Sequence, residues 1–108
     1  MKKFSIYQVN DEAENARYIK YSGLDFVRKH FTLTLDIYSK VYEGEFDQRG
    51  HETDVYKVLD NLYHIFNVNH PEDFKGHSLS VSDIVEIDGK FYYCDDYGWE
   101  QVEFEAAA

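Results

Sequence analysis

Residues 80–97, SVSDIVEIDGKFYYCDDY, predict an antiparallel β-hairpin and decide the fold of the chain. Alternating side chains at 80–87 and aromatic residues at 90–97 are typical of two paired strands. Between them, Asp88 and Gly89 form a pair that favours a type I′ turn, in which both central residues have a positive φ. The sequence therefore predicts a small sheet in the C-terminal part of the chain.

Further strands and two helices are expected in the rest of the chain. Strand patterns are expected at residues 3–10, 18–21, 35–46 and 100–104, and a turn or loop at residues 11–17. Helix patterns are expected at residues 22–31 and 53–66, with Ser22 and Thr53 as their N-caps. This order predicts an α+β fold: a small antiparallel sheet with one main and one shorter helix packed on one face, and a C-terminal β-hairpin.

The composition indicates a single domain over residues 1–108, with residues 106–108 as a tail. The formal net charge of −10 speaks against direct contacts with nucleic-acid phosphates or anionic membranes. No apolar run approaches the length of a membrane span. The single cysteine, Cys94, cannot form an internal disulfide. We therefore expect a cytoplasmic protein.

Four segments of the chain carry a family resemblance: FSIYQV (4–9), VYEGEF (41–46), LYHIFNVNHPEDFKGHSLSVSDIVEI (62–87) and FYYCDDYGWEQV (91–102). They resemble the YodL-like family of small bacterial domains, which are often encoded on mobile elements. The closing YYCDDYGW departs from the usual family pattern at Cys94, Asp96 and Trp99. The resemblance brings no established catalytic activity or cofactor. It implies an accessory protein that modulates a host protein or an element-encoded protein.

Three residues are expected to have structural roles: Gly76, Asp83 and Gly89. Gly76 and Asp83 lie in the part of the chain where the resemblance is most specific, and Gly89 belongs to the predicted turn. Asp83 follows two serines closely, so we expect it to accept hydrogen bonds from backbone or hydroxyl donors at a turn.

Residue types that could support catalysis or metal binding are present, but their spacing matches no known motif. The most suggestive metal set is His64, His70 and His77 with Asp73, whose spacing fits neither a zinc ribbon nor HExxH. Cys94 lies in the middle of a predicted strand, where a cysteine usually behaves as a small apolar residue. Paired carboxylates in the C-terminal strands are a weak signal for hydrolysis. We therefore expect a protein that is not an enzyme and has no metal or cofactor, with a small hydrolase or metal-binding protein as a remaining alternative.

The acidic C-terminal part is the strongest functional candidate, because residues 81–108 carry eight acidic residues and one lysine. The expected partner-binding residues are the carboxylates Asp88, Asp95, Asp96, Glu100 and Glu103, with Tyr97 and Trp99 as aromatic anchors. A dense array of carboxylates could mimic DNA and block a basic nucleic-acid-binding protein of host defence, as an anti-restriction or anti-CRISPR inhibitor does. Two alternatives stay open: a regulatory adaptor for a partner such as bacterial cell-shape machinery, and an acidic surface that only keeps the protein soluble. The oligomeric state is left open.

Overall fold

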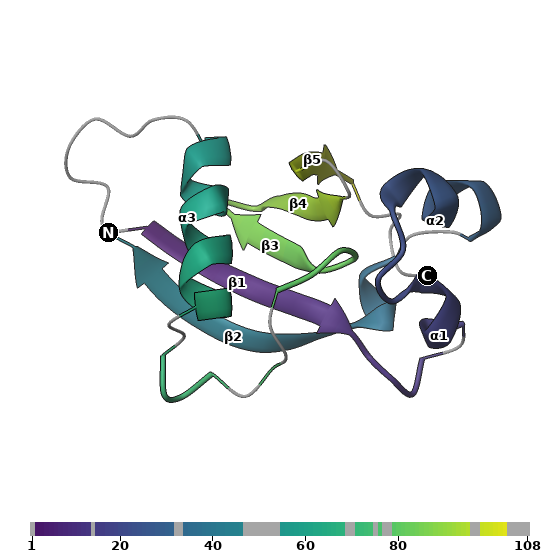
Figure 1. The fold of residues 1–108 in the computed structure, drawn as a ribbon, viewed down its shortest axis with the longest axis horizontal. Helices are drawn as coiled ribbons and strands as arrows, with labels where there is room; N and C mark the ends of the chain where they lie inside the picture. The colour runs from purple at the N-terminus through teal and green to yellow at the C-terminus, as the bar shows by residue number, and fades with distance from the viewer. Residues whose placement is uncertain are drawn as a thin grey trace.

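A five-stranded antiparallel sheet with the strand order β2-β1-β3-β4-β5 forms the centre of the computed structural model (Figure 1). The structure describes residues 2–13, 15–31, 34–46, 55–68, 71–74, 76, 79–95 and 98–103. The helices of this part are α1, α2, α3 and a short 3-10 helix. The predicted α+β class, the small antiparallel sheet and the C-terminal hairpin are confirmed.

Short turns join β3 to β4 and β4 to β5, whereas β1 pairs with two strands that lie far from it in the sequence. The strand β1 (Lys2–Val9) lies between β2 (Tyr38–Phe46) and β3 (Ile84–Ile87), and β4 (Lys90–Asp95) pairs with β3 and with β5 (Gly98–Val102). A β-bulge interrupts the pairing of β1 with β2 between Ile6 and Tyr7.

The turn between β3 and β4 has the predicted geometry. Asp88 and Gly89 have φ values of 55° and 78°, as a type I′ turn requires. The strand before it is shorter than predicted, because Ser82 has a φ of 88° that breaks the extended backbone. β3 therefore begins at Ile84, although the Ser82 and Cys94 amides still donate hydrogen bonds across to the Cys94 and Asp83 carbonyls.

The longest helix, α3 (Val55–Val68), covers one face of the sheet. Its buried side chains are Leu59, Leu62 and Phe66, which recur at the spacing of one helical face. They pack against strand residues of one parity: Phe4, Ile6, Val85, Ile87 and Tyr92. The predicted helix at 53–66 is thus present with shifted ends, and its expected N-cap, Thr53, lies outside the described residues.

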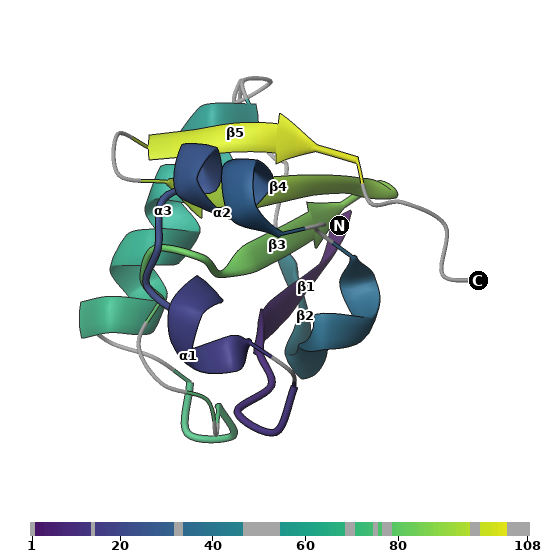
Figure 2. The same ribbon diagram turned by 90° about the vertical axis from the view of Figure 1, so that its right-hand side faces the viewer.

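The two short helices, α1 (Ala16–Ile19) and α2 (Leu24–His30), cover the opposite face (Figure 2). Their buried residues pack against strand residues of the other parity: Val9, Ile84, Tyr93 and Val102. The expectation that both helices share one face is therefore wrong. The reason lies in the strands, because neighbours such as Tyr92 and Tyr93 are both buried, and this requires cover on both sides.

Three local predictions are corrected. Residues 18–21 do not form a strand, because α1 ends at Ile19 and Tyr21 has a φ of 68°. Ser22 is not an N-cap: Gly23 holds that position in α2, and the Ser22 hydroxyl donates to the Tyr18 carbonyl. Residues 35–37 form a 3-10 helix (Leu35–Ile37) before β2 begins.

Candidate functional site

The carboxylates predicted to bind a partner do not gather into one array in the described structure. Asp88 lies exposed in the β3–β4 turn and Glu103 lies exposed just after β5. The Glu100 carboxylate lies 3.8 Å from the Arg28 guanidinium of α2, and both side chains are about half exposed. Asp96 and Tyr97 lie outside the described residues.

Asp95 has a structural contact that its sequence position does not reveal. Its Oδ1 accepts a hydrogen bond of 3.0 Å from the Leu24 amide, which opens α2. The first amides of a helix have no partner within the helix, and a carboxylate at this end also interacts favourably with the helix dipole. Asp95 therefore anchors α2 to the end of β4.

Trp99 and Glu100 lie on opposite faces of the sheet. Trp99 is opposite Cys94 in the β4–β5 register, and its half-buried ring packs against the cluster under α3, with its centroid 6.4 Å from that of Tyr63. Glu100 is opposite Tyr93, whose side chain belongs to the cluster under α1 and α2. The predicted aromatic anchor is therefore part of the packing under α3, on the face away from Glu100.

Asp83 is the most deeply buried carboxylate of the described chain. Its Oδ2 accepts hydrogen bonds from the Ser80 amide, at 2.9 Å, and from Gln8 Nε2 on β1, at 3.2 Å. Burial raises the pKa of the Asp83 carboxyl to about 7, although these two hydrogen bonds and the charge of Lys20 act to lower it. Gln8 was not among the site residues predicted from the sequence. Its only sequence signal is that a polar residue occupies a position of β1 whose side chain points into the fold.

Gly76 is required by the position of the Gln8 side chain. A Cβ atom on Gly76 would lie 2.5 Å from Gln8 Oε1 and 3.1 Å from the Phe74 ring. Even alanine would therefore displace the amide that reaches Asp83. Gly76, Gln8 and Asp83 form one packed series that fixes the segment before β3 against β1.

The turn at residues 80–83 also holds the short helices and β2. The Ser82 hydroxyl accepts a hydrogen bond from the Tyr21 amide at 3.0 Å, and the Tyr38 hydroxyl donates to the Ser82 carbonyl at 2.7 Å. The Tyr93 hydroxyl donates to the Ser22 carbonyl at 2.6 Å. These hydrogen bonds join the 80–83 turn, β2, β4 and the connection between α1 and α2, so this region is a junction between elements of the fold.

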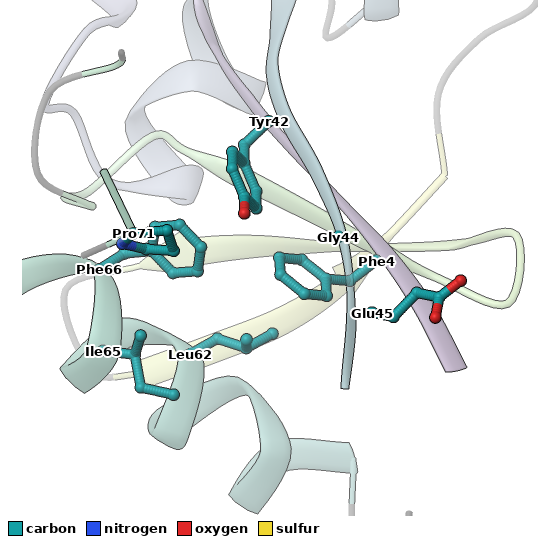
Figure 3. A pocket seen from close by; sticks show the side chains of 8 residues that line it. All are labelled: Phe4, Tyr42, Gly44, Glu45, Leu62, Ile65, Phe66 and Pro71. Atoms are coloured by element: carbon teal, nitrogen blue, oxygen red, sulfur yellow. The ribbon is translucent and has the colours of Figure 1, made fainter. Parts of the chain in front are cut away.

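A cavity opens between α3 and the edge strand β2, and we call it the α3–β2 groove (Figure 3). Its volume is about 290 Å³, and its lining residues are Phe4, Tyr42, Gly44, Glu45, Leu62, Ile65, Phe66 and Pro71. The rings of Phe4, Tyr42 and Phe66 pack against one another with centroids 5.2–6.0 Å apart. A Cβ on Gly44 would lie 2.9 Å from the Tyr42 ring and 3.0 Å from the Phe4 ring, so glycine is needed for this close packing.

Residues with potential for chemistry are dispersed in the described part of the chain. There, no group of three or more His, Cys, Asp or Glu side chains could hold a metal ion. His64 is exposed on α3, whereas His70 and His77 lie outside the described residues. A second cavity of about 220 Å³ brings Asp60 and Asp95 near the buried Cys94, but Asp95 is held by the Leu24 amide. Among the described residues, no helix is long and apolar enough to span a membrane.

Comparison with known proteins identifies the family. The family model of the YodL-like domain matches residues 3–104, which is nearly the whole chain. A search of curated proteins and a search of solved structures each found no match. The chain therefore belongs to the YodL-like family, as the sequence motifs indicated.

Proposed function

We propose that this YodL-like protein is a non-catalytic binding module that recognises a basic protein partner. The observation that carries the proposal is the charge of its surface. Among the described residues, twelve carboxylate side chains and seven basic side chains are exposed. With a net charge of −10 for the chain, the protein attracts basic surfaces over distances of about a Debye length.

The favoured partner is a nucleic-acid-binding protein whose basic groove the module occupies. Such grooves bind phosphates through Lys and Arg side chains, and carboxylates can pair with the same side chains. The module would then compete with DNA or RNA, which is the mode of action of anti-restriction and anti-CRISPR inhibitors.

The candidate contact residues are revised by the geometry. Asp88, Glu100 and Glu103 are exposed and remain the carboxylates that we assign to the partner. Asp95 is a poor choice for mutagenesis, because its replacement would also release the N-terminus of α2. Asp96 and Tyr97 stay in the proposal on the strength of the sequence alone.

A charge-matched comparison tests the proposal. The immobilised protein is used to capture partners from a bacterial lysate, and the triple variant Asp88→Lys/Glu100→Lys/Glu103→Lys is compared with the control Glu12→Lys/Asp25→Lys/Asp36→Lys. Both variants change the net charge by the same amount at exposed positions. We expect the first variant to lose the partner and the control to keep it. We further expect the captured partner to bind nucleic acid and to release it when the module is added; unchanged capture by the first variant contradicts the proposal.

A second candidate function is a regulatory adaptor that docks through an apolar surface. The observation that favours it is a set of exposed apolar and aromatic side chains on α3: Tyr56, Tyr63, Ile65 and Val68. Exposed apolar patches often mark protein–protein contacts. A salt titration separates the two functions, because the affinity of a DNA mimic falls steeply with salt, whereas apolar docking responds little.

A further inference from the structure

We infer that the α3–β2 groove is the docking site for an extended basic segment of the partner protein. The segment adds to the outer edge of β2 as a further strand and inserts an apolar side chain into the cavity. This inference rests on the proposed function, because it assigns the place where a protein partner binds.

The first support is the position of β2 at the edge of the sheet. β2 is the first strand in the sheet order and pairs with β1 along one side only, so no described strand pairs with its other side. Its nine residues make it the longest described strand. An exposed edge offers a row of backbone donors and acceptors, and peptides that add to a sheet use such edges.

The second support is the cavity beside that edge. A strand added next to β2 directs alternate side chains to the face that α3 covers. The cavity lies on this face, between Gly44 of β2 and the side chains of Leu62 and Ile65 of α3 (Figure 3). Ile65 is 42% exposed at the rim, so an incoming apolar side chain would remove it from water.

The third support is the charge around the groove. None of the eight lining residues is basic. The Glu45 carboxylate points away from the cavity (Figure 3), to the side of β2 on which Glu43 also lies and to which the neighbours of an inserted apolar residue would point. The Tyr42 hydroxyl donates to the exposed Asp73 carboxylate at 3.2 Å, which places an acidic group beside the aromatic wall. Lys3 lies opposite Glu45 in the register, and Lys40 lies 3.8 Å from Glu43, so the edge also carries bases, but the groove itself does not. A segment with Lys or Arg on either side of its apolar residue complements this arrangement.

The same charges argue against a second copy of this chain as the occupant. Two β2 edges that pair about Gly44 would bring Glu43 of each copy opposite Glu45 of the other, within two molecules that each carry a net charge of −10. Like charges that face one another across paired strands are destabilising.

The test begins with a displayed library of random nonapeptides that is selected on the immobilised full-length protein. Two variants of α3 then serve as a matched pair: Ile65→Lys at the groove, and Tyr56→Lys on the other flank of the helix, where Tyr56 is 44% exposed. We expect selected peptides that alternate apolar and basic residues, that lose affinity at least tenfold for Ile65→Lys, and that stay within twofold for Tyr56→Lys. A synthetic copy with alternate backbone nitrogens methylated should also lose at least tenfold, because N-methylation blocks strand pairing and keeps every side chain.

Amide chemical shifts of the labelled protein locate the peptide. Shifts that cluster in β2 and around Leu62 and Ile65 are expected. Any of four results would overturn the inference. These are shifts that cluster on β5, equal affinity of the methylated peptide, a selection that yields no peptide, and a dimer that light scattering detects and amide shifts locate at β2. The proposed function is judged separately: if the lysate partner is still captured by Ile65→Lys and lost by the Asp88/Glu100/Glu103 variant, the groove is wrong and the acidic module stands.

Discussion

The two faces of the sheet are closed in different ways. Under α3, the contacts are between apolar and aromatic side chains, with Phe66 at their centre, 4.9–5.9 Å from the rings of Phe4, Tyr42 and Phe74. On the other face, α1 and α2 are short and bury few side chains. They are held by side chains of the sheet and of the 80–83 turn that bind the Leu24 amide of α2 and the backbone of the α1–α2 connection at Tyr21 and Ser22. A long helix can be held by its apolar face, whereas helices of one or two turns need additional hydrogen bonds.

Phe66→Ala should disrupt the packing under α3 and cause the largest loss of stability of the three variants. Phe66 is almost fully buried, and its removal leaves a cavity among the aromatic rings of this face. We expect the free energy of unfolding to fall by about 3–5 kcal/mol, as measured by urea denaturation. Val68→Ala, at the exposed end of the same helix, should cost less than about 0.5 kcal/mol. A similar loss in both variants would show that the ring cluster does not hold this face.

Asp83→Asn should change how the stability of the junction between the two faces depends on pH. The folded-state pKa of about 7 lies above the ordinary value of 3.8, so the folded protein binds the proton more tightly than the unfolded chain. The contribution of Asp83 to stability is therefore full below about pH 4 and is lost as the pH rises through 7. Asparagine keeps an oxygen acceptor for the Ser80 amide and Gln8 and does not ionise in this range. We expect the variant to gain stability relative to the parent between pH 4 and 7, by roughly 2–4 kcal/mol in total.

Denaturation curves of both proteins from pH 4 to 8.5 measure this difference. Glu103→Gln removes an exposed carboxylate and serves as the control for the loss of one negative charge. A difference for Asp83→Asn that does not change with pH would mean that the burial of Asp83 does not control its ionisation.

Asp95→Ala should weaken the α2 face and have the smallest effect of the three. The variant loses the acceptor of the Leu24 amide, and we expect a cost of about 1 kcal/mol, as for other residues that cap a helix. Hydrogen exchange gives a direct measurement, because the Leu24 amide should exchange faster while the amides of α3 keep their protection. If the Leu24 amide kept its protection, the carboxylate would not be the group that anchors α2.

The parts of the fold that follow from local patterns could be predicted. The spacing of Leu59, Leu62 and Phe66 indicates α3, and the pair Asp88 and Gly89 indicates the hairpin. The family could also be recognised, because its motifs run through most of the chain. Cover on both faces also has a signal in the sequence, because apolar residues follow one another in IVEI and FYY instead of alternating with polar ones.

The roles of the site residues could not be predicted to the same degree, because their partners are distant in the sequence. Asp95 binds an amide 71 residues away, and Asp83 binds a side chain 75 residues away. Nothing near Asp95 distinguishes an anchoring carboxylate from a surface one. The exposed sides of α3 and the outer edge of β2 depend on which elements pack together, and this appears only in the folded structure.

The place of β1 in the sheet order has a consequence for how the protein is made. β1 is synthesised first among the described strands, yet one of its neighbours, β3, follows roughly 80 residues later. On the ribosome, neither core can be completed until residues 84–87 have emerged, because β3 contributes to both. Contacts between such distant segments slow folding, since a long loop must close before they form. The nascent chain therefore carries β1 with an unpaired edge until β3 has emerged, and such an edge is open to pairing with another chain.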